Sequence, residues 1–290
     1  MAKLSFALLL LALLIPSSVS FAQENKTAAA LPTELLKRTT TRKESARFNF
    51  GGTVTVVGAP RGSVTIEGWQ RNEVELTAEI EQTALTEADL DQLAKVNTFV
   101  FDEDLNHVSV LTTGTHDREF MKKAAKNFPK KLLNFRWKID YVLRVPTNTD
   151  LEVTAGYGAV KVSGVEGALR ISATESETEL TLTGGAVSTT VTTGVVKLTI
   201  PVRSWRGAGA DIRLASGILI VDLPTGFNGD IDADVLRSGQ IINTHDGIVA
   251  REKPGIQQQT MRARAGAGGA FFKLTVGDGT VNIRRSEPAK

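Results

Sequence analysis

The sequence contains no cysteine among its 290 residues. Disulfide bonds, thiolate metal ligands and a lipid anchor on an N-terminal cysteine are therefore excluded. The sequence has three histidines, and none of them stands in an HExxH or HxH pair, which argues against a zinc site. We therefore expect neither a metal ion nor another cofactor.

Long apolar runs are also missing beyond the first 22 residues. No later stretch approaches the roughly 18 apolar residues of a membrane-spanning helix, so we expect no transmembrane segment there. The net charge of +2 is nearly balanced, which argues against nucleic acid as a partner. A charged partner must therefore be recognised by a local cluster.

Residues 1–22 are typical of a secretory signal peptide. Lys3 provides the positive start, and residues 4–15 are apolar apart from Ser5. Ser20 and Ala22 place small residues three and one before a cleavage point. Twelve helical residues rise about 18 Å, less than the ~30 Å hydrocarbon core. We expect cleavage after Ala22 and export to the periplasm, surface or medium of a bacterium.

The remaining chain divides into three expected segments. Residues 23–45 are polar and alanine-rich without a sustained period, and we expect a disordered linker. Residues 46–285 are expected to form a single domain, and residues 286–290 a short tail. Within the domain, residues 84–134 predict an insertion of helices and a hairpin. Thr86 with Asp89 resembles a helix start, apolar residues follow at helical spacing, and residues 102–106 resemble a hairpin loop between two short apolar alternations.

Short apolar alternations recur about every ten residues, and turn residues separate them. Residues 54–56, 64–66 and 74–76 give three such units, and the pattern returns over 151–244. A short fixed period is typical of repeat proteins, in which each unit buries its apolar face against its neighbours. The sequence therefore predicts an all-β fold, a β-solenoid or β-helix-like stack of short strands. Stacked hairpins or a sandwich sheet would give a similar spacing.

Two further strand patterns frame this repeat. Residues 135–145 alternate apolar and polar side chains strictly, apart from Val142, and predict the longest strand, which Pro146 ends. Residues 274–283 contain two apolar alternations around Gly277-Asp278-Gly279 and predict a closing hairpin.

Three motifs carry a resemblance to a known family. GSVTIEGW at 62–69 leads into NEVEL at 72–76, YVLRVP follows at 141–146, and LEV at 151–153 leads into GAVKVSGVEG at 158–167. Their order is similar to that of the bacterial putative-adhesin domain, a family of exported, repetitive β-solenoid proteins of largely unknown function. The resemblance spans roughly residues 46–285. It implies a β-helix-like fold in the cell envelope and carries no catalytic residues.

The densest charge cluster lies in residues 118–138, where Glu119 is the only acid. Phenylalanines are interleaved with the basic residues, and residues 118–134 predict a basic amphipathic helix that Pro129 interrupts. Such a helix can contact anionic lipid or an acidic glycan. Its alternative is to pack its phenylalanines on the domain and leave its lysines in solvent. The candidate polyanion contacts are Arg118, Lys122, Lys123, Lys126, Lys130 and Lys131.

The strongest candidate for chemistry is the alternation of Asp230, Asp232 and Asp234. A strand would place these carboxylates on one face, where they form either a Ca²⁺ site or an ordinary polar surface. The sequence does not match a calcium-binding loop of the EF-hand type, because Val235 and Ile241 occupy the glycine and glutamate positions. The polar surface is therefore the preferred interpretation, and we expect no metal ligand here.

These observations favour an exported, non-enzymatic protein of the cell envelope with an adhesin-like binding or scaffold role. Its partner would be an envelope polyanion, a glycan or a protein. The alternative is a carbohydrate-active enzyme on a β-helix that acts on acidic polysaccharide, for which the three aspartates are the only candidate acids. A purely structural role is the third interpretation.

Overall fold

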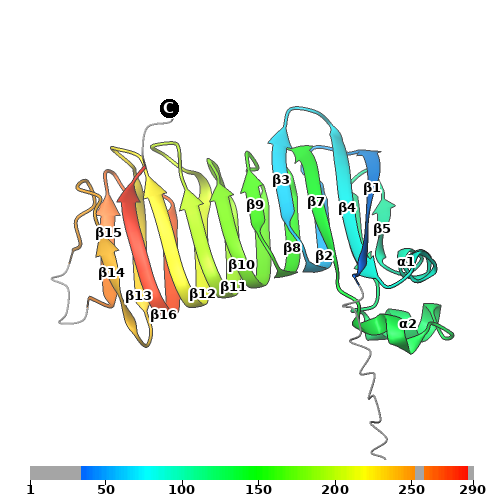
Figure 1. The fold of residues 1–290 in the computed structure, drawn as a ribbon. Helices are drawn as coiled ribbons and strands as arrows, with labels where there is room; N and C mark the ends of the chain where they lie inside the picture. The colour runs from blue at the N-terminus through cyan, green and yellow to red at the C-terminus, as the bar shows by residue number, and fades with distance from the viewer. Residues whose placement is uncertain (1–33, 252–257, 287–290) are drawn as a thin grey trace, which may run out of the picture. The chain divides into compact units, whose positions relative to one another are not determined.

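Strands dominate the computed structural model, which describes residues 34–251 and 258–286. The expected signal peptide and most of the expected tail lie outside these residues. Sixteen strands form one sheet, accompanied by the short helices α1 (Glu87–Ala94) and α2 (Arg118–Ala124) and the 3-10 helix η1 (Lys130–Asn134) (Figure 1). The expected all-β class is confirmed. The strands are β1 (Leu36–Arg47), β2 (Thr53–Arg61), β3 (Val64–Trp69), β4 (Glu73–Ala84), β5 (Thr98–Glu103), β6 (His107–Thr113), β7 (Trp137–Pro146), β8 (Asp150–Tyr157), β9 (Val160–Ser163), β10 (Ala168–Thr181), β11 (Gly184–Thr199), β12 (Arg206–Leu223), β13 (Gly229–Val235), β14 (Gly239–Asn243), β15 (Thr260–Ala265) and β16 (Phe271–Arg285).

Parallel pairing joins the strands from β2 and β3 to β13 and β14, and we call this array the parallel ladder. Leu169 of β10 pairs with Leu151 of β8 on one side and with Val187 of β11 on the other. Both pairings join residues that are 18 positions apart in the sequence, so apolar residues lie beside apolar residues on the neighbouring strands. Because side chains alternate along a strand, this register places the apolar set of every strand on the same side.

Each long strand of the ladder has two halves, and a column of glycines lies at the point between them. The first half of β10 pairs with β8 and its second half pairs with β9. Gly194, Gly217 and Gly279 occupy this position in β11, β12 and β16, with φ angles of +135°, +139° and +140°. A Cβ atom on Gly279 would lie 1.8 Å from the carbonyl oxygen of Gly217. Only glycine therefore allows these backbones to stack.

Buried side chains from both halves of the ladder form the main core. Toward the β13 end, Phe272 of β16 is only 1% exposed, and its ring centre lies 5.5 Å from those of Trp205 and Phe227. Burial of such large apolar side chains is the dominant stabilising contribution to a fold of this kind.

The order of the strands in space departs from their order in the chain. Strand β16 comes after every other described strand, yet it lies between β12 on one side and both β13 and β14 on the other (Figure 1). Strand β7 likewise lies between β3 and β4. Both strands fill interior positions that earlier parts of the chain leave open.

Antiparallel strands close both ends of the ladder. Strand β15 pairs with β13 at one end, and β4, β1 and β5 are added at the other. The edge strands β1 and β5 are bridged by Arg42, whose Nη1 donates to Oγ1 of Thr98 at 2.8 Å. Its guanidinium carbon lies 4.2 Å from the ring centre of Phe99. This contact joins two edges whose backbone groups would otherwise be open to other chains.

The expected linker needs correction. Residues 36–47, most of which fall in the predicted 23–45 linker, form β1 and pair with β4 from Leu36↔Ala84 to Arg47↔Glu73. The basic side chains of β1 face an acidic strand, as in the 2.9 Å ion pair between Lys37 and Glu81. A charged edge strand has no apolar alternation, so its sequence resembles a linker. Residues 23–33 lie outside the described residues.

Three other predictions also differ from the structure. The helix expected over 118–134 ends at Ala124, five residues before Pro129, because Ala125 leaves the helical conformation with φ −131° and ψ 47°, and residues 130–134 form only a 3-10 turn. The longest strand is β12 rather than β7. The expected closing hairpin is one continuous strand, β16, because Gly279 bends the chain without reversing it. The predicted helix start is confirmed, since Oγ1 of Thr86 accepts from the backbone N–H of Asp89.

Candidate binding surfaces

The basic segment, residues 118–131, lies beside the N-terminal end of the sheet, and its cations are exposed. All six predicted contacts, Arg118, Lys122, Lys123, Lys126, Lys130 and Lys131, carry exposed side chains. Leu132 is buried with Leu90 and Leu93 of α1, and Phe128 and Phe135 pack against this small core. The phenylalanines thus anchor the segment while its lysines remain in solvent.

Two of the six cations are held by neighbouring carboxylates. Lys122 pairs with Glu119 at 2.7 Å, and Lys131 pairs with the buried Asp89 at 2.9 Å. Hydrogen bonds from Lys131 and from Thr86 lower the pKa of Asp89, which keeps this carboxylate charged. Lys131 therefore has a structural role. Within the described residues, the other four cations, Arg118, Lys123, Lys126 and Lys130, form no ion pair.

The three aspartates of β13 face arginines of the antiparallel strand β15. Arg264 donates to Asp230 at 2.8 Å, while Arg262 forms ion pairs with both Asp232 and Asp234. The hydrogen bond from Arg264 lowers the pKa of Asp230, whereas burial raises the pKa of Asp232. These pairs join β13 to the strand that closes the sheet. No carboxylate and histidine cluster suited to a metal ion occurs in the residues that the structure describes.

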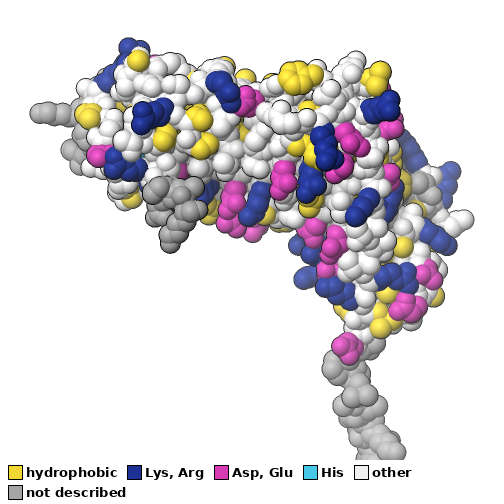
Figure 2. Space-filling view, turned by 90° about the horizontal axis from the view of Figure 1, so that it is seen from above, with side chains coloured by type: hydrophobic (Ala, Val, Ile, Leu, Met, Phe, Trp, Pro, Cys, Tyr) yellow, Lys and Arg dark blue, Asp and Glu magenta, His cyan; other side chains and the backbone are white. Residues whose placement is uncertain are grey.

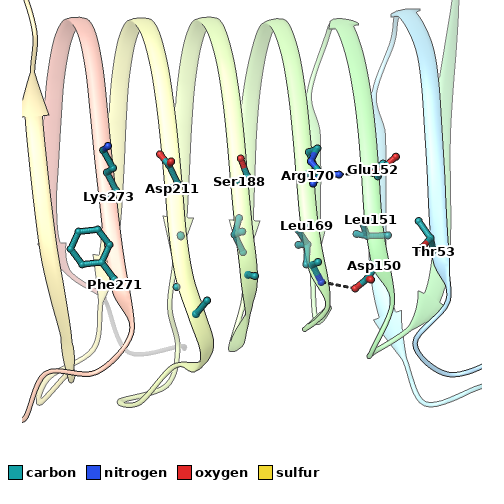
Figure 3. A pocket seen from close by; sticks show the side chains of 16 residues that line it. Thr53, Asp150, Leu151, Glu152, Leu169, Arg170, Ser188, Asp211, Phe271 and Lys273 are labelled. Atoms are coloured by element: carbon teal, nitrogen blue, oxygen red, sulfur yellow. Dashed lines mark hydrogen bonds and ion pairs between the residues drawn. The ribbon is translucent and has the colours of Figure 1, made fainter.

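A trough, which the sequence did not predict, crosses β2, β8, β10, β11, β12 and β16 (Figure 3). It has a volume of 560 Å³. Its floor contains Ala168, Ala186 and Gly209, which occupy equivalent register positions. Phe271 lies at one end with 49% of its surface exposed, and Asp150 and Thr53 lie at the other.

A row of polar side chains runs along one side of the trough. Its members occupy one register position on five successive strands and are Glu152, Arg170, Ser188, Asp211 and Lys273. Arg170 donates to Glu152 at 2.6 Å across neighbouring strands (Figure 3), and Arg213 donates to Asp211 at 2.6 Å. Asp150 accepts from the backbone N–H of Ala168 at 2.7 Å. The view from above in Figure 2 shows positive and negative side chains interspersed, without one large patch of a single sign.

A sequence signal for the trough does exist. Glu152, Arg170 and Ser188 are spaced by 18 residues, and so are Asp150, Ala168 and Ala186. Aligning the chain with itself at this spacing would have brought the two rows together. The apolar alternations recur about every ten residues, and this shorter spacing obscures the two rows. The 18-residue spacing is longer because it includes one segment from each half of the ladder.

Comparisons with known proteins reach only a distant structural likeness. No protein-family model matches the sequence, and no curated protein is similar to it. A crystal structure described as a putative cell adhesion protein from Clostridium sporogenes ATCC 15579 is 12% identical, with a TM-score of 0.37. The alignment covers 85% of this chain and 100% of that one.

Two other solved structures are described as putative adhesins. The one from Bacteroides fragilis NCTC 9343 is 11% identical with a TM-score of 0.29, and the alignment covers 85% of this chain and 97% of that one. The one from Parabacteroides merdae ATCC 43184 is 9% identical with a TM-score of 0.27, covering 84% and 95%. TM-scores this low carry no argument about function, so membership of the family stays a prediction.

In the described residues, no helix has the length and apolar character needed to cross a membrane.

Proposed function

We propose that the chain is an exported, non-enzymatic protein of the bacterial cell envelope, whose parallel ladder is a β-solenoid and whose basic segment binds an anionic envelope polymer or lipid surface. The signal-like residues 1–22 support export. The 18-residue offsets between β8, β10 and β11 support a solenoid, since they bring equivalent residues into parallel register.

One observation carries the binding role. Arg118, Lys123, Lys126 and Lys130 are exposed on a segment that a small apolar core holds in place. Within the described residues these four cations have no ionic partner. A lysine near an anionic surface contributes on the order of 1 kcal/mol, so several together give measurable, salt-dependent attraction.

The catalytic alternative receives no support from this geometry. Sugar cleavage by acid–base chemistry needs a carboxyl group that is free to donate a proton. The aspartates of β13 face arginines, and none of the three lines the trough. Paired catalytic carboxylates are about 5–9.5 Å apart. Within the trough, Glu152 and Asp211 lie three strands apart, about 14 Å at the usual strand spacing. Asp150 and Glu152 are closer, about 7 Å along β8, but Asp150 accepts from the backbone N–H of Ala168 and Glu152 accepts from Arg170.

The proposal is tested by changing Lys123, Lys126 and Lys130 to serine in one variant. Lys131 is kept because it pairs with the buried Asp89. Binding to lipopolysaccharide, acidic glycans and anionic vesicles is measured at low and high salt. We expect the wild type to bind more weakly as salt rises, and the variant to lose roughly 100-fold in affinity, since three lysines contribute about 3 kcal/mol.

A matched control removes the same charge elsewhere. Lys43, Arg47 and Arg203 are exposed residues outside the basic segment, and changing them to serine lowers the net charge equally. This control should bind nearly as the wild type does. Equal losses in both triple variants would show that net charge alone matters, and absence of binding by the wild type would remove the polyanion role.

A further inference from the structure

We infer that the trough across the parallel ladder is a second binding site, which takes an extended, uncharged polysaccharide chain laid across the strands. The polar row of Glu152, Arg170, Ser188, Asp211 and Lys273 would hydrogen-bond the sugar hydroxyls. Phe271 would pack against the apolar face of a sugar ring. The site is separate from the basic segment.

The dimensions of the trough suit a linear chain. It crosses six parallel strands, from Thr53 on β2 to Phe271 on β16. Five strand spacings amount to about 24 Å. One spacing is close to the length of a pyranose ring in an extended chain. A chain of about five sugars could therefore place one ring at each strand step.

The floor of the trough allows close approach. Ala168 and Ala186 are exposed and follow one another in register, and Gly209 comes next. These positions carry at most a methyl group, while the polar row two residues further along each strand carries larger side chains, Arg170, Ser188 and Asp211. A flat ring can therefore lie on the backbone of the sheet and reach the polar row with its edge.

The charge of the trough favours a neutral ligand over an anionic one. The three lining carboxylates, Asp150, Glu152 and Asp211, are balanced by the lining cations Arg170 and Lys273 and by Arg213, which pairs with Asp211, so no net positive charge attracts an anion. An acidic glycan would meet these carboxylates, and like charges repel. Neutral hydroxyl groups both donate and accept hydrogen bonds, so they fit a row that alternates acceptors with donors.

One side chain of this row and the exposed ring at its end offer free interactions. Lys273 is exposed, and no ion pair involving it is seen within the described part of the chain. Phe271 exposes 49% of its surface at the end of the trough, where an aromatic face can pack against C–H groups.

The test uses the full chain and neutral cello-oligosaccharides of two to six rings, with hexagalacturonate as the charged comparison. Binding is measured by calorimetry and by ligand-observed NMR. We expect affinity to rise with length up to about five rings, the span of the trough. Phe271→Ala should weaken binding about three- to tenfold, the range that one aromatic contact supports. Ala186→Leu should weaken it further by raising the floor.

Two controls separate this site from the rest of the molecule. Tyr157→Ala removes an exposed ring that does not line the trough, and it should leave binding unchanged. The variant with serine at 123, 126 and 130 should also retain binding, so failure of the polyanion site would leave this result intact. The inference is overturned by absence of oligosaccharide binding, by equal binding to Phe271→Ala, or by hexagalacturonate binding in the trough as tightly as cellohexaose.

Discussion

Replacing Phe272 with alanine is expected to lower the free energy of unfolding by about 3–5 kcal/mol, the usual cost of removing a buried phenylalanine. The ring is 1% exposed and lies between Trp205 and Phe227. It also projects into the core from β16, the interior strand that comes last among the described strands. Its loss should therefore weaken the attachment of β16 as well as the core. Chemical denaturation followed by circular dichroism measures the effect.

The adjacent Phe271 provides the matched control. Its side chain points to the opposite face of the same strand and is half exposed. Phe271→Ala should change the free energy of unfolding by less than about 1 kcal/mol, because little apolar surface leaves a buried site. Similar losses in the two variants would contradict the assignment of inner and outer faces to β16.

Gly279→Ala is expected to cost about 3–5 kcal/mol, which combines an unfavourable backbone conformation with a steric clash. The φ angle of Gly279 is +140°, and a Cβ atom would lie 1.8 Å from the carbonyl oxygen of Gly217. Backbone atoms of a stacked strand cannot move aside independently, so β12 and β16 would have to separate. The free energy of unfolding should fall accordingly in the same denaturation experiment.

Gly269→Ala separates the two contributions. Gly269 has a φ angle of +138°, but a Cβ atom there would meet nothing within 4 Å. This variant should show only the conformational cost, of order 1–3 kcal/mol. If Gly269→Ala were as damaging as Gly279→Ala, close stacking of the glycine column would not be the reason for its glycines.

Local patterns were sufficient for much of the fold. The alternation over 135–145 predicted β7, and Thr86 with Asp89 predicted the start of α1. Each of these signals lies within a few residues, where side-chain periodicity and capping act directly. The all-β class follows from many such alternations, because every one of them favours an extended backbone.

The arrangement of the strands could not be predicted in the same way. Successive strands have similar short apolar alternations, so nothing within β16 indicates that it pairs with β12 across 62 residues of chain. The basic strand β1 could be recognised only from the acidic strand β4 beside it. The ion-pairing role of the β13 aspartates likewise depends on Arg262 and Arg264, which lie on the separate strand β15. Partner choice depends on long-range register, which one segment does not contain.

The interior position of β16 also has a consequence for the order of events during synthesis. A chain made from its N-terminus produces β12, β13 and β14 before the strand that separates them. Until residues 271–285 have been made, the facing edges of β12 and β13 lack their parallel partner. Open edges of this kind pair readily with other chains and are accessible to proteases. Completion of the sheet therefore requires synthesis to reach this segment, and we expect products that end before residue 271 to be degraded or to aggregate.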